Sequence, residues 1–128
     1  MSRFMLALKT IISGYQDIST YIFDEIDVGI SGATAETVAK KFADISRNVQ
    51  IIAISHLPQV CAMSDCALKI SKSETDGKTF TTVKALDAVK KIEEIIRLIG
   101  GSKTDEISIR HAENMIALAT EYKDNLKK

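Results

Sequence analysis

Two adjacent carboxylates follow directly on a short apolar run near the start of the chain. Residues 20–23 are typical of a buried strand, and Asp24 and Glu25 come next. Open α/β sheets bind ligands at the carboxyl ends of their strands. In nucleoside triphosphatases, an aspartate there helps to hold Mg²⁺ on the phosphates, and a following glutamate can take a proton from the attacking water. An ordinary solvated turn would give the same pattern.

A histidine follows the second apolar run in the same way. Residues 49–54 form a nearly continuous apolar strand, and His56 comes just after it. Its imidazole could hydrogen-bond a terminal phosphate oxygen, or it could simply bond a nearby carbonyl. Asp24, Glu25 and His56 together, at the ends of neighbouring parallel strands, favour a functional site. His111 falls in a predicted helix and is most simply a surface or packing residue.

The segment that follows the carboxylates contains two glycines, Gly29 and Gly32. Glycine permits backbone shapes that let another chain or a phosphate approach closely, although a flexible connection would also use it. The sequence contains no G-x-x-x-x-G-K-[ST] motif, which is the loop that wraps the phosphates of a bound nucleotide. The residues therefore supply an acid and a base without a phosphate cradle.

The apolar spacing predicts the elements that position these residues. Residues 4–15 form an amphipathic helix, and a second helix begins at Ser31 or Thr34 and ends at residues 47–48. This second helix joins the strands at 20–23 and 49–54 into a parallel, right-handed βαβ unit, and we expect both faces of its sheet to be covered. Pro58 suits the first turn of a short helix through about residue 63.

The second half of the chain predicts a β-hairpin and two helices. Residues 66–73 and 79–86 flank a turn that contains Asp76 and Gly77. A helix over 89–99 stops at the glycines 100–101, and a capping box from Ser102 to Asp105 opens the last helix. The fold class is therefore α/β, with a parallel βαβ core, a following hairpin and two C-terminal helices.

The composition fits one globular domain over residues 1–128. Lys and Arg number 17 against 17 Asp and Glu, so net charge gives no reason to expect broad binding to nucleic acid or to anionic membranes. No apolar run approaches the length of a membrane span, and we expect a cytoplasmic location without a membrane partner. Cys61 and Cys66 have no second cluster of metal ligands, and we expect reduced thiols.

These motifs together resemble the carboxyl-terminal half of an ATP-binding-cassette ATPase head of the SMC-like class. Residues 21–25 look like the Walker B strand, residues 26–32 like the D-loop, and residues 53–56 like the switch-histidine loop. Residues 2–9 look like the segment after the LSGGE signature of such heads. The runs FDEIDVGISG at 23–32 and SHLPQV at 55–60 are similar to a branch of this class that repairs DNA breaks.

The resemblance implies a role for each candidate residue. Asp24 would bind Mg²⁺ through water, Glu25 would polarise the attacking water and His56 would sense the γ-phosphate. Ser31 and Gly32 would belong to the cofactor-binding set, with Ser31 where such heads usually carry a D-loop aspartate. The implied cofactors are ATP and Mg²⁺, and the implied partners are the N-terminal lobe of the same polypeptide, a second head in a homodimer, and DNA.

The departures from the family pattern concern the missing motifs. The chain starts inside an amphipathic helix and lacks both the Walker A loop and the signature Ser-Gly-Gly, so we expect a fragment that by itself neither binds ATP well nor hydrolyses it. One alternative is a non-enzymatic interaction module that keeps Asp24, Glu25 and His56 as relics. A response-regulator-like domain would need about five alternating βα units, which this pattern does not supply.

Overall fold

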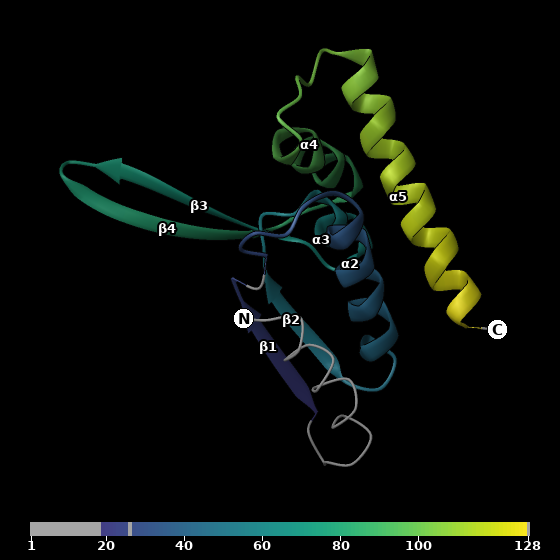
Figure 1. The fold of residues 1–128 in the computed structure, drawn as a ribbon. Coiled ribbons are helices and arrows are strands. Elements are labelled where there is room, and N and C mark those ends of the chain that lie inside the picture. Colours follow the sequence, from purple (N-terminus) through teal and green to yellow (C-terminus); the bar gives the residue numbers. More distant parts are fainter. Residues whose placement is uncertain (1–18, 26, 128) are drawn as a thin grey trace.

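The computed structural model describes residues 19–25 and 27–127 (Figure 1). The helix predicted over residues 4–15 lies outside this part of the chain. The order of elements follows the prediction of a βαβ unit, a hairpin and two helices. These elements are β1 (Thr20–Asp24), α2 (Gly32–Ser46), β2 (Gln50–Ile54), α3 (Pro58–Met63), β3 (Leu68–Thr75), β4 (Lys78–Ala85), α4 (Ala88–Leu98) and α5 (Glu106–Leu126).

The predicted parallel pairing of the first two strands is confirmed. β1 and β2 run side by side from the pair Thr20 and Gln50 to the pair Asp24 and Ile54. Helix α2 packs on one face of this pair, where Phe23 is fully buried and its ring lies 4.9 Å from that of Phe42. The buried members of this core are Tyr21, Phe23, Val38, Phe42, Ile45 and Val49. Packing of α2 therefore holds the carboxyl ends of both strands in a defined place.

The opposite face of the strand pair differs from the prediction. Ile22, Ile52 and Ile54 share this face by register, and they are 62%, 44% and 46% exposed. The prediction that both faces are covered was therefore wrong for the residues described. The apolar run in β2 fits a strand whose second face is buried by something other than these elements.

A second core lies among the last helices. Its buried residues are Ala39, Ala43, Ala62, Met63, Ile95, Ile96, Ala112 and Ala119, contributed by α2, α3, α4 and α5. Because alanine has a small side chain, helices that meet through it can approach closely. Helix α5 crosses this group and also reaches α2, since Tyr122 Oη donates a hydrogen bond of 2.8 Å to Asp44 Oδ1. The helices thus brace α2 from the side opposite the sheet.

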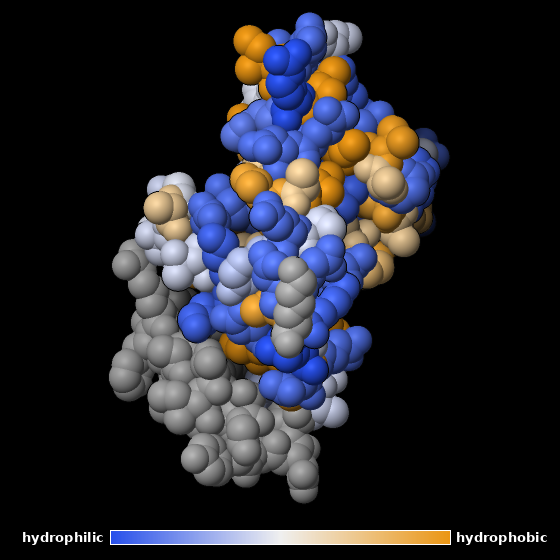
Figure 2. Space-filling model, turned by 90° about the vertical axis from the view of Figure 1, so that its right-hand side faces the viewer, coloured by the Kyte–Doolittle hydropathy of each residue, from blue (hydrophilic) through white to orange (hydrophobic). Residues whose placement is uncertain are grey.

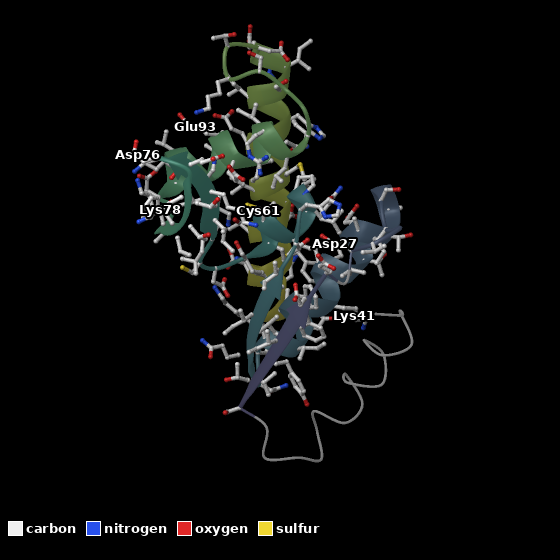
Figure 3. The ribbon with its side chains drawn as sticks, turned by 90° about the vertical axis from the view of Figure 1, so that its left-hand side faces the viewer. Asp27, Lys41, Cys61, Asp76, Lys78 and Glu93 are labelled. Carbon is white, nitrogen blue, oxygen red and sulfur yellow. The ribbon has the colours of Figure 1, made fainter. Side chains whose placement is uncertain are left out.

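The predicted hairpin is confirmed, with strands of the predicted length and a tighter turn than the sequence indicated. Strands β3 and β4 pair from Leu68 and Ala85 up to Thr75 and Lys78, which leaves a two-residue turn. Asp76 and Gly77 have φ angles of +53° and +70°, as in the turn type that matches strand twist. In Figure 1 the hairpin projects away from the rest of the molecule, and its tip residues are labelled in Figure 3.

The helix ends show one correction to the predicted caps. Asp105, and not Ser102, is the N-cap of α5, because its carboxylate accepts hydrogen bonds from the backbone amides of Ile107 and Ser108. A carboxylate at the N-cap satisfies free amides and favours the helix dipole. Gly100, with φ of +74°, follows α4 at the predicted stop.

The surface over the C-terminal helices mixes hydrophilic and hydrophobic residues (Figure 2). On α5, Ile107 and Leu118 are 79% and 57% exposed. None of the helices in residues 19–25 and 27–127 is both long and apolar enough to cross a membrane.

Candidate functional site

The parallel register brings the two predicted loops to one edge of the sheet. Asp24 is paired with Ile54, so the residues that follow each of them leave β1 and β2 at the same level. Asp24, Glu25 and His56 are all exposed there. In the described part of the chain, however, His56 makes its side-chain contact with Asp27 and not with Asp24 or Glu25. The predicted neighbours therefore share an edge, and a fourth residue connects the loops.

Glu25 has an unusual backbone conformation for its residue type. Its φ angle is +51°, in the left-handed region that a side chain with a Cβ rarely adopts. Such strain costs on the order of 1 kcal/mol or more and collects at functional sites. Glu25 lies at a bend directly after β1.

Asp27 was not among the residues predicted to form the site, and it is the best-connected side chain there. The residue is only 2% exposed. Its Oδ2 accepts hydrogen bonds from Ser55 Oγ at 2.6 Å and from the backbone amide of His56 at 2.7 Å, and His56 Nδ1 lies 3.0 Å away. Figure 3 places Asp27 at the end of the parallel strands, near the start of α2. The sequence did offer one signal for Asp27. It is a third acidic residue, in a loop predicted to lie beside the strand end that precedes His56.

The pKa of Asp27 is held below its usual value by these donors. Burial of the carboxyl group acts in the opposite direction and would raise the pKa. The hydrogen bonds from Ser55, from the His56 amide and from the amide of Asp27 itself outweigh it together with the favourable electrostatic contribution of the nearby His56. Asp27 is therefore an ionised, buried hydrogen-bond acceptor at neutral pH.

Ser31 and Gly32 lie where α2 begins. Ser31 is the N-cap, but its side chain makes no capping hydrogen bond, and Gly32 is the first helical residue with φ of +56°. A Cβ added to Gly29 or Gly32 would meet no atom of the described residues within 4 Å. The two glycines therefore serve the backbone shape of the loop, and the space beside them is open to a ligand or to another chain.

The side chains at this edge of the sheet can be compared with the ligands that Mg²⁺ requires. Within the described ranges, no group of three or more His, Cys, Asp or Glu side chains is arranged to hold a metal ion. Mg²⁺ usually keeps several waters and is bound by one or two carboxylates together with substrate phosphates. A single exposed carboxylate at Asp24, at the end of a strand, suits that mode of binding and does not suit an all-protein cage.

Other residues singled out in the sequence are less connected to this edge. Cys61 and Cys66 are free thiols, as expected, and burial raises the pKa of Cys61. His111 is exposed on α5. On the hairpin, the register puts Lys69, Lys78 and Lys84 on one face and Lys72 on the other, and Lys69 Nζ pairs with Glu94 Oε2 at 2.6 Å.

Sequence comparison relates the whole chain to one group of proteins. It is 48% identical over 125 residues to the DNA repair protein RecN of Halalkalibacterium halodurans, a match that covers 98% of this chain and 22% of the relative. The RecN proteins of Bacillus subtilis and Rickettsia conorii are 43% and 41% identical, with 96% and 92% of this chain covered. The chain thus spans about a fifth of the length of these relatives. No family model matches it.

A solved structure supports the same assignment of the fold. It comes from work on ATP-driven dimerization and DNA-stimulated activation of SMC ATPases, and it superposes with a TM-score of 0.59 at 26% identity. The match covers 80% of this chain and 64% of the other. Over almost its entire length the chain is therefore similar to a C-terminal segment of the DNA repair protein RecN, and its fold is that of part of an SMC-type ATPase head.

Proposed function

We propose that the chain is the C-terminal lobe of an SMC-like ATPase that acts in the repair of DNA double-strand breaks. The observation that carries this proposal is the register of β1 and β2, which puts Asp24-Glu25 and Ser55-His56 at one edge of the sheet. The similarity to RecN proteins supports the link to DNA repair. In this proposal the lobe contributes residues for Mg-ATP hydrolysis within a dimer of heads.

Each exposed side chain at this edge has a distinct task in the proposed reaction. Mg²⁺, when bound with ATP, would neutralise charge that develops on the phosphate oxygens. Asp24 would hold the hydrated ion at the end of β1. Glu25 would orient the attacking water and accept its proton, and His56 would donate a hydrogen bond to the terminal phosphate. Ser31 and Gly32, at the open start of α2, would lie against the nucleotide.

The exposed apolar face of the strand pair supports the proposed partner within the same polypeptide. Ile22, Ile52 and Ile54 leave an apolar surface on the sheet, which has two strands within the described residues. A parallel sheet is normally buried on both faces. We assign this face to the N-terminal lobe of the complete protein, which would also bring the phosphate-wrapping loop that is missing from this sequence. The second head and DNA are the other proposed partners.

The test uses the complete protein that contains this chain. Replacing Glu25 by Gln should leave ATP binding and ATP-dependent dimerization intact and lower steady-state ATP hydrolysis by about 100-fold or more, the usual scale for loss of a general base. Glu113→Gln, on the exposed side of α5, is the matched control and should hydrolyse ATP at the wild-type rate.

Two results would contradict the proposal. Hydrolysis at the wild-type rate in the Glu25→Gln protein would remove Glu25 as the base. A complete protein whose association and DNA binding show no dependence on ATP would favour the non-enzymatic interaction module instead.

A further inference from the structure

Asp27 is a buried carboxylate that has no role in the function proposed above. It comes three residues after Asp24, in the loop between β1 and α2, and its side chain is 3% exposed. A buried ionised group is costly unless hydrogen bonds satisfy it. Here those bonds come almost entirely from one short segment, the loop that follows β2, and this concentration indicates a specific structural task.

The contacts of Asp27 fix both the backbone and the side chain of His56. The same oxygen, Oδ2, accepts from the His56 backbone amide at 2.7 Å and lies 3.0 Å from His56 Nδ1. Ser55 Oγ donates to this oxygen at 2.6 Å and accepts from the Leu57 amide at 3.1 Å. The network therefore holds the turn from residue 55 to 57 and sets the direction of the imidazole.

The chemistry of a carboxylate decides which ring nitrogen carries the hydrogen. An ionised carboxylate only accepts hydrogen bonds, so a hydrogen on Nδ1, 3.0 Å from Oδ2, is favoured over a lone pair there. Nε2 is then the free atom of the ring. It accepts a hydrogen bond when the imidazole is neutral and donates one when the imidazole is protonated. The His56 side chain is 72% exposed, so a ligand can reach it.

We infer that Asp27 is the positioning residue for His56: it holds Nδ1 in its protonated form and presents Nε2 to the ligand at the edge of the sheet. The geometry of this contact is independent of any reaction. Only the identity of the ligand, a terminal phosphate oxygen, rests on the proposed function; because that oxygen only accepts, Nε2 donates to it when both ring nitrogens carry hydrogen. Through Asp27, the loop before α2 and the loop after β2 act as one unit.

The first experiment measures the tautomer of His56 in the 128-residue chain. At a pH where the ring is neutral, two-bond ¹H–¹⁵N NMR correlations identify the protonated nitrogen. A neutral histidine in water favours hydrogen on Nε2. The chain contains one other histidine, His111, which is exposed on α5 and serves as the internal reference. We expect His56 to carry its hydrogen on Nδ1 and His111 to show the ordinary preference.

Substitutions separate the positioning role from general support of the loop. Asp27→Ala should return His56 to the ordinary preference, whereas Ser55→Ala should keep hydrogen on Nδ1 because the contact between Asp27 and His56 remains. If Asp27→Ala does not fold, Asp27→Asn, of nearly equal size, should still lower the Nδ1-protonated fraction because its amide is uncharged. A wild-type His56 with hydrogen mainly on Nε2, or an unchanged tautomer in a folded Asp27 variant, would overturn the inference.

A second measurement joins the inference to the reaction in the complete protein. Asp27→Asn should lower kcat for ATP by about 10- to 100-fold, the scale expected for a misplaced catalytic group, with a smaller change in KM. A variant with altered His56 tautomer but unchanged kcat would contradict the link to catalysis. Failure of the function itself appears separately, as wild-type hydrolysis in Glu25→Gln.

Discussion

Asp27 and His56, which lie 29 positions apart in the sequence, meet through a single carboxylate oxygen. Oδ2 of Asp27 accepts from the backbone amide of His56 at 2.7 Å and lies 3.0 Å from its Nδ1. The parallel strands β1 and β2 make this contact possible, because their paired ends bring the two following loops together. The stability of the edge should therefore depend on the ionisation of Asp27.

The first prediction concerns that dependence on pH. The pKa of Asp27 is lowered in the folded protein, so the folded state favours the carboxylate more than the unfolded state does. Its contribution is complete above the usual aspartate pKa and is lost as the pH falls through the lowered value. We expect Asp27→Asn to cost about 2 kcal/mol of unfolding free energy at pH 7, the scale of hydrogen bonds to a charged group.

Urea denaturation of both proteins at pH 7, 5 and 3 checks this prediction. The difference in unfolding free energy between wild type and Asp27→Asn should be the same at pH 7 and pH 5. It should be smaller at pH 3, which is below the ordinary aspartate pKa of about 3.9. Glu113→Gln, exposed on α5, should stay within about 0.5 kcal/mol of wild type. A difference that grows on acidification would contradict the lowered pKa of Asp27.

The second prediction concerns the backbone of Glu25, where glycine should be more stabilising than alanine. At an ordinary exposed helical site, glycine is less stable than alanine by about 1 kcal/mol. Glu25 has φ of +51°, where alanine retains the strain and glycine relieves it. We therefore expect Glu25→Gly to be more stable than Glu25→Ala by about 1 kcal/mol. Thermal or urea unfolding of the two variants measures this difference.

The matched control lies on α2. Glu36 is exposed in that helix and pairs with Lys40 at 2.7 Å, a contact that either replacement removes. There the ordinary order should hold, with Glu36→Ala more stable than Glu36→Gly. If both sites show alanine as the more stable residue, the left-handed conformation of Glu25 is wrong.

The sequence predicted most of the fold because its local signals agree with the packing. The apolar spacing of α2, with Val38, Phe42 and Ile45 on one face, matches the buried core. The parallel pairing followed from two apolar runs joined by a helix. The turn at Asp76 and Gly77 required left-handed residues, and the structure has them. The similarity to an SMC ATPase structure agrees with this architecture.

The features that sequence reasoning missed depend on contacts between distant residues. The link from Asp27 to Ser55 and His56 exists only once β1 and β2 are paired, so no local pattern reports it. The capping of α5 was assigned to Ser102 because Asp105 fitted the partner position of a capping box; the Asp105 carboxylate instead caps the helix itself. The exposure of Ile52 could not be read from an apolar strand alone.

The third prediction concerns the base of the hairpin. Glu94 is 8% exposed, and its carboxylate contacts Arg97 Nη2 at 2.6 Å and Lys69 Nζ at 2.6 Å. The hydrogen bond from Arg97 is the main reason that the pKa of Glu94 is lowered. Since Lys69 belongs to β3, this group ties the hairpin to α4. We expect Glu94→Gln to cost about 1.5 kcal/mol, the lower end for a hydrogen-bonded charge.

Its neighbour Glu93 is the control. Glu93 pairs with Lys103 at 2.6 Å, but its side chain is 42% exposed, and such surface pairs contribute about 0.5 kcal/mol or less. Urea denaturation of Glu94→Gln and Glu93→Gln gives the comparison. Amide exchange at the β3 and β4 residues next to Lys69 gives a second readout, which should accelerate only in Glu94→Gln. If the two substitutions lower the unfolding free energy equally, burial of the Glu94 ion pairs does not increase their contribution to stability.

The last prediction concerns Lys91, which stabilises the end of α3 from the neighbouring helix α4. Its Nζ donates hydrogen bonds to Ser64 O at 2.7 Å and to Ala62 O at 3.2 Å. Burial lowers the pKa of Lys91. Just below the ordinary lysine pKa of about 10.4, the unfolded chain then binds more protons than the folded chain, so stability rises with pH in this window.

Lys91→Met removes both the donor and this dependence. We expect a loss of about 1 kcal/mol at pH 7, the net worth of such hydrogen bonds, and a larger loss near pH 10. The control is Lys90→Met, because the Lys90 side chain is 62% exposed and pairs with Asp87 at the surface. It should change stability by about 0.5 kcal/mol or less. Urea denaturation at the two pH values decides the matter, and a deficit of Lys91→Met that shrinks toward pH 10 would mean that burial does not lower the pKa of this lysine.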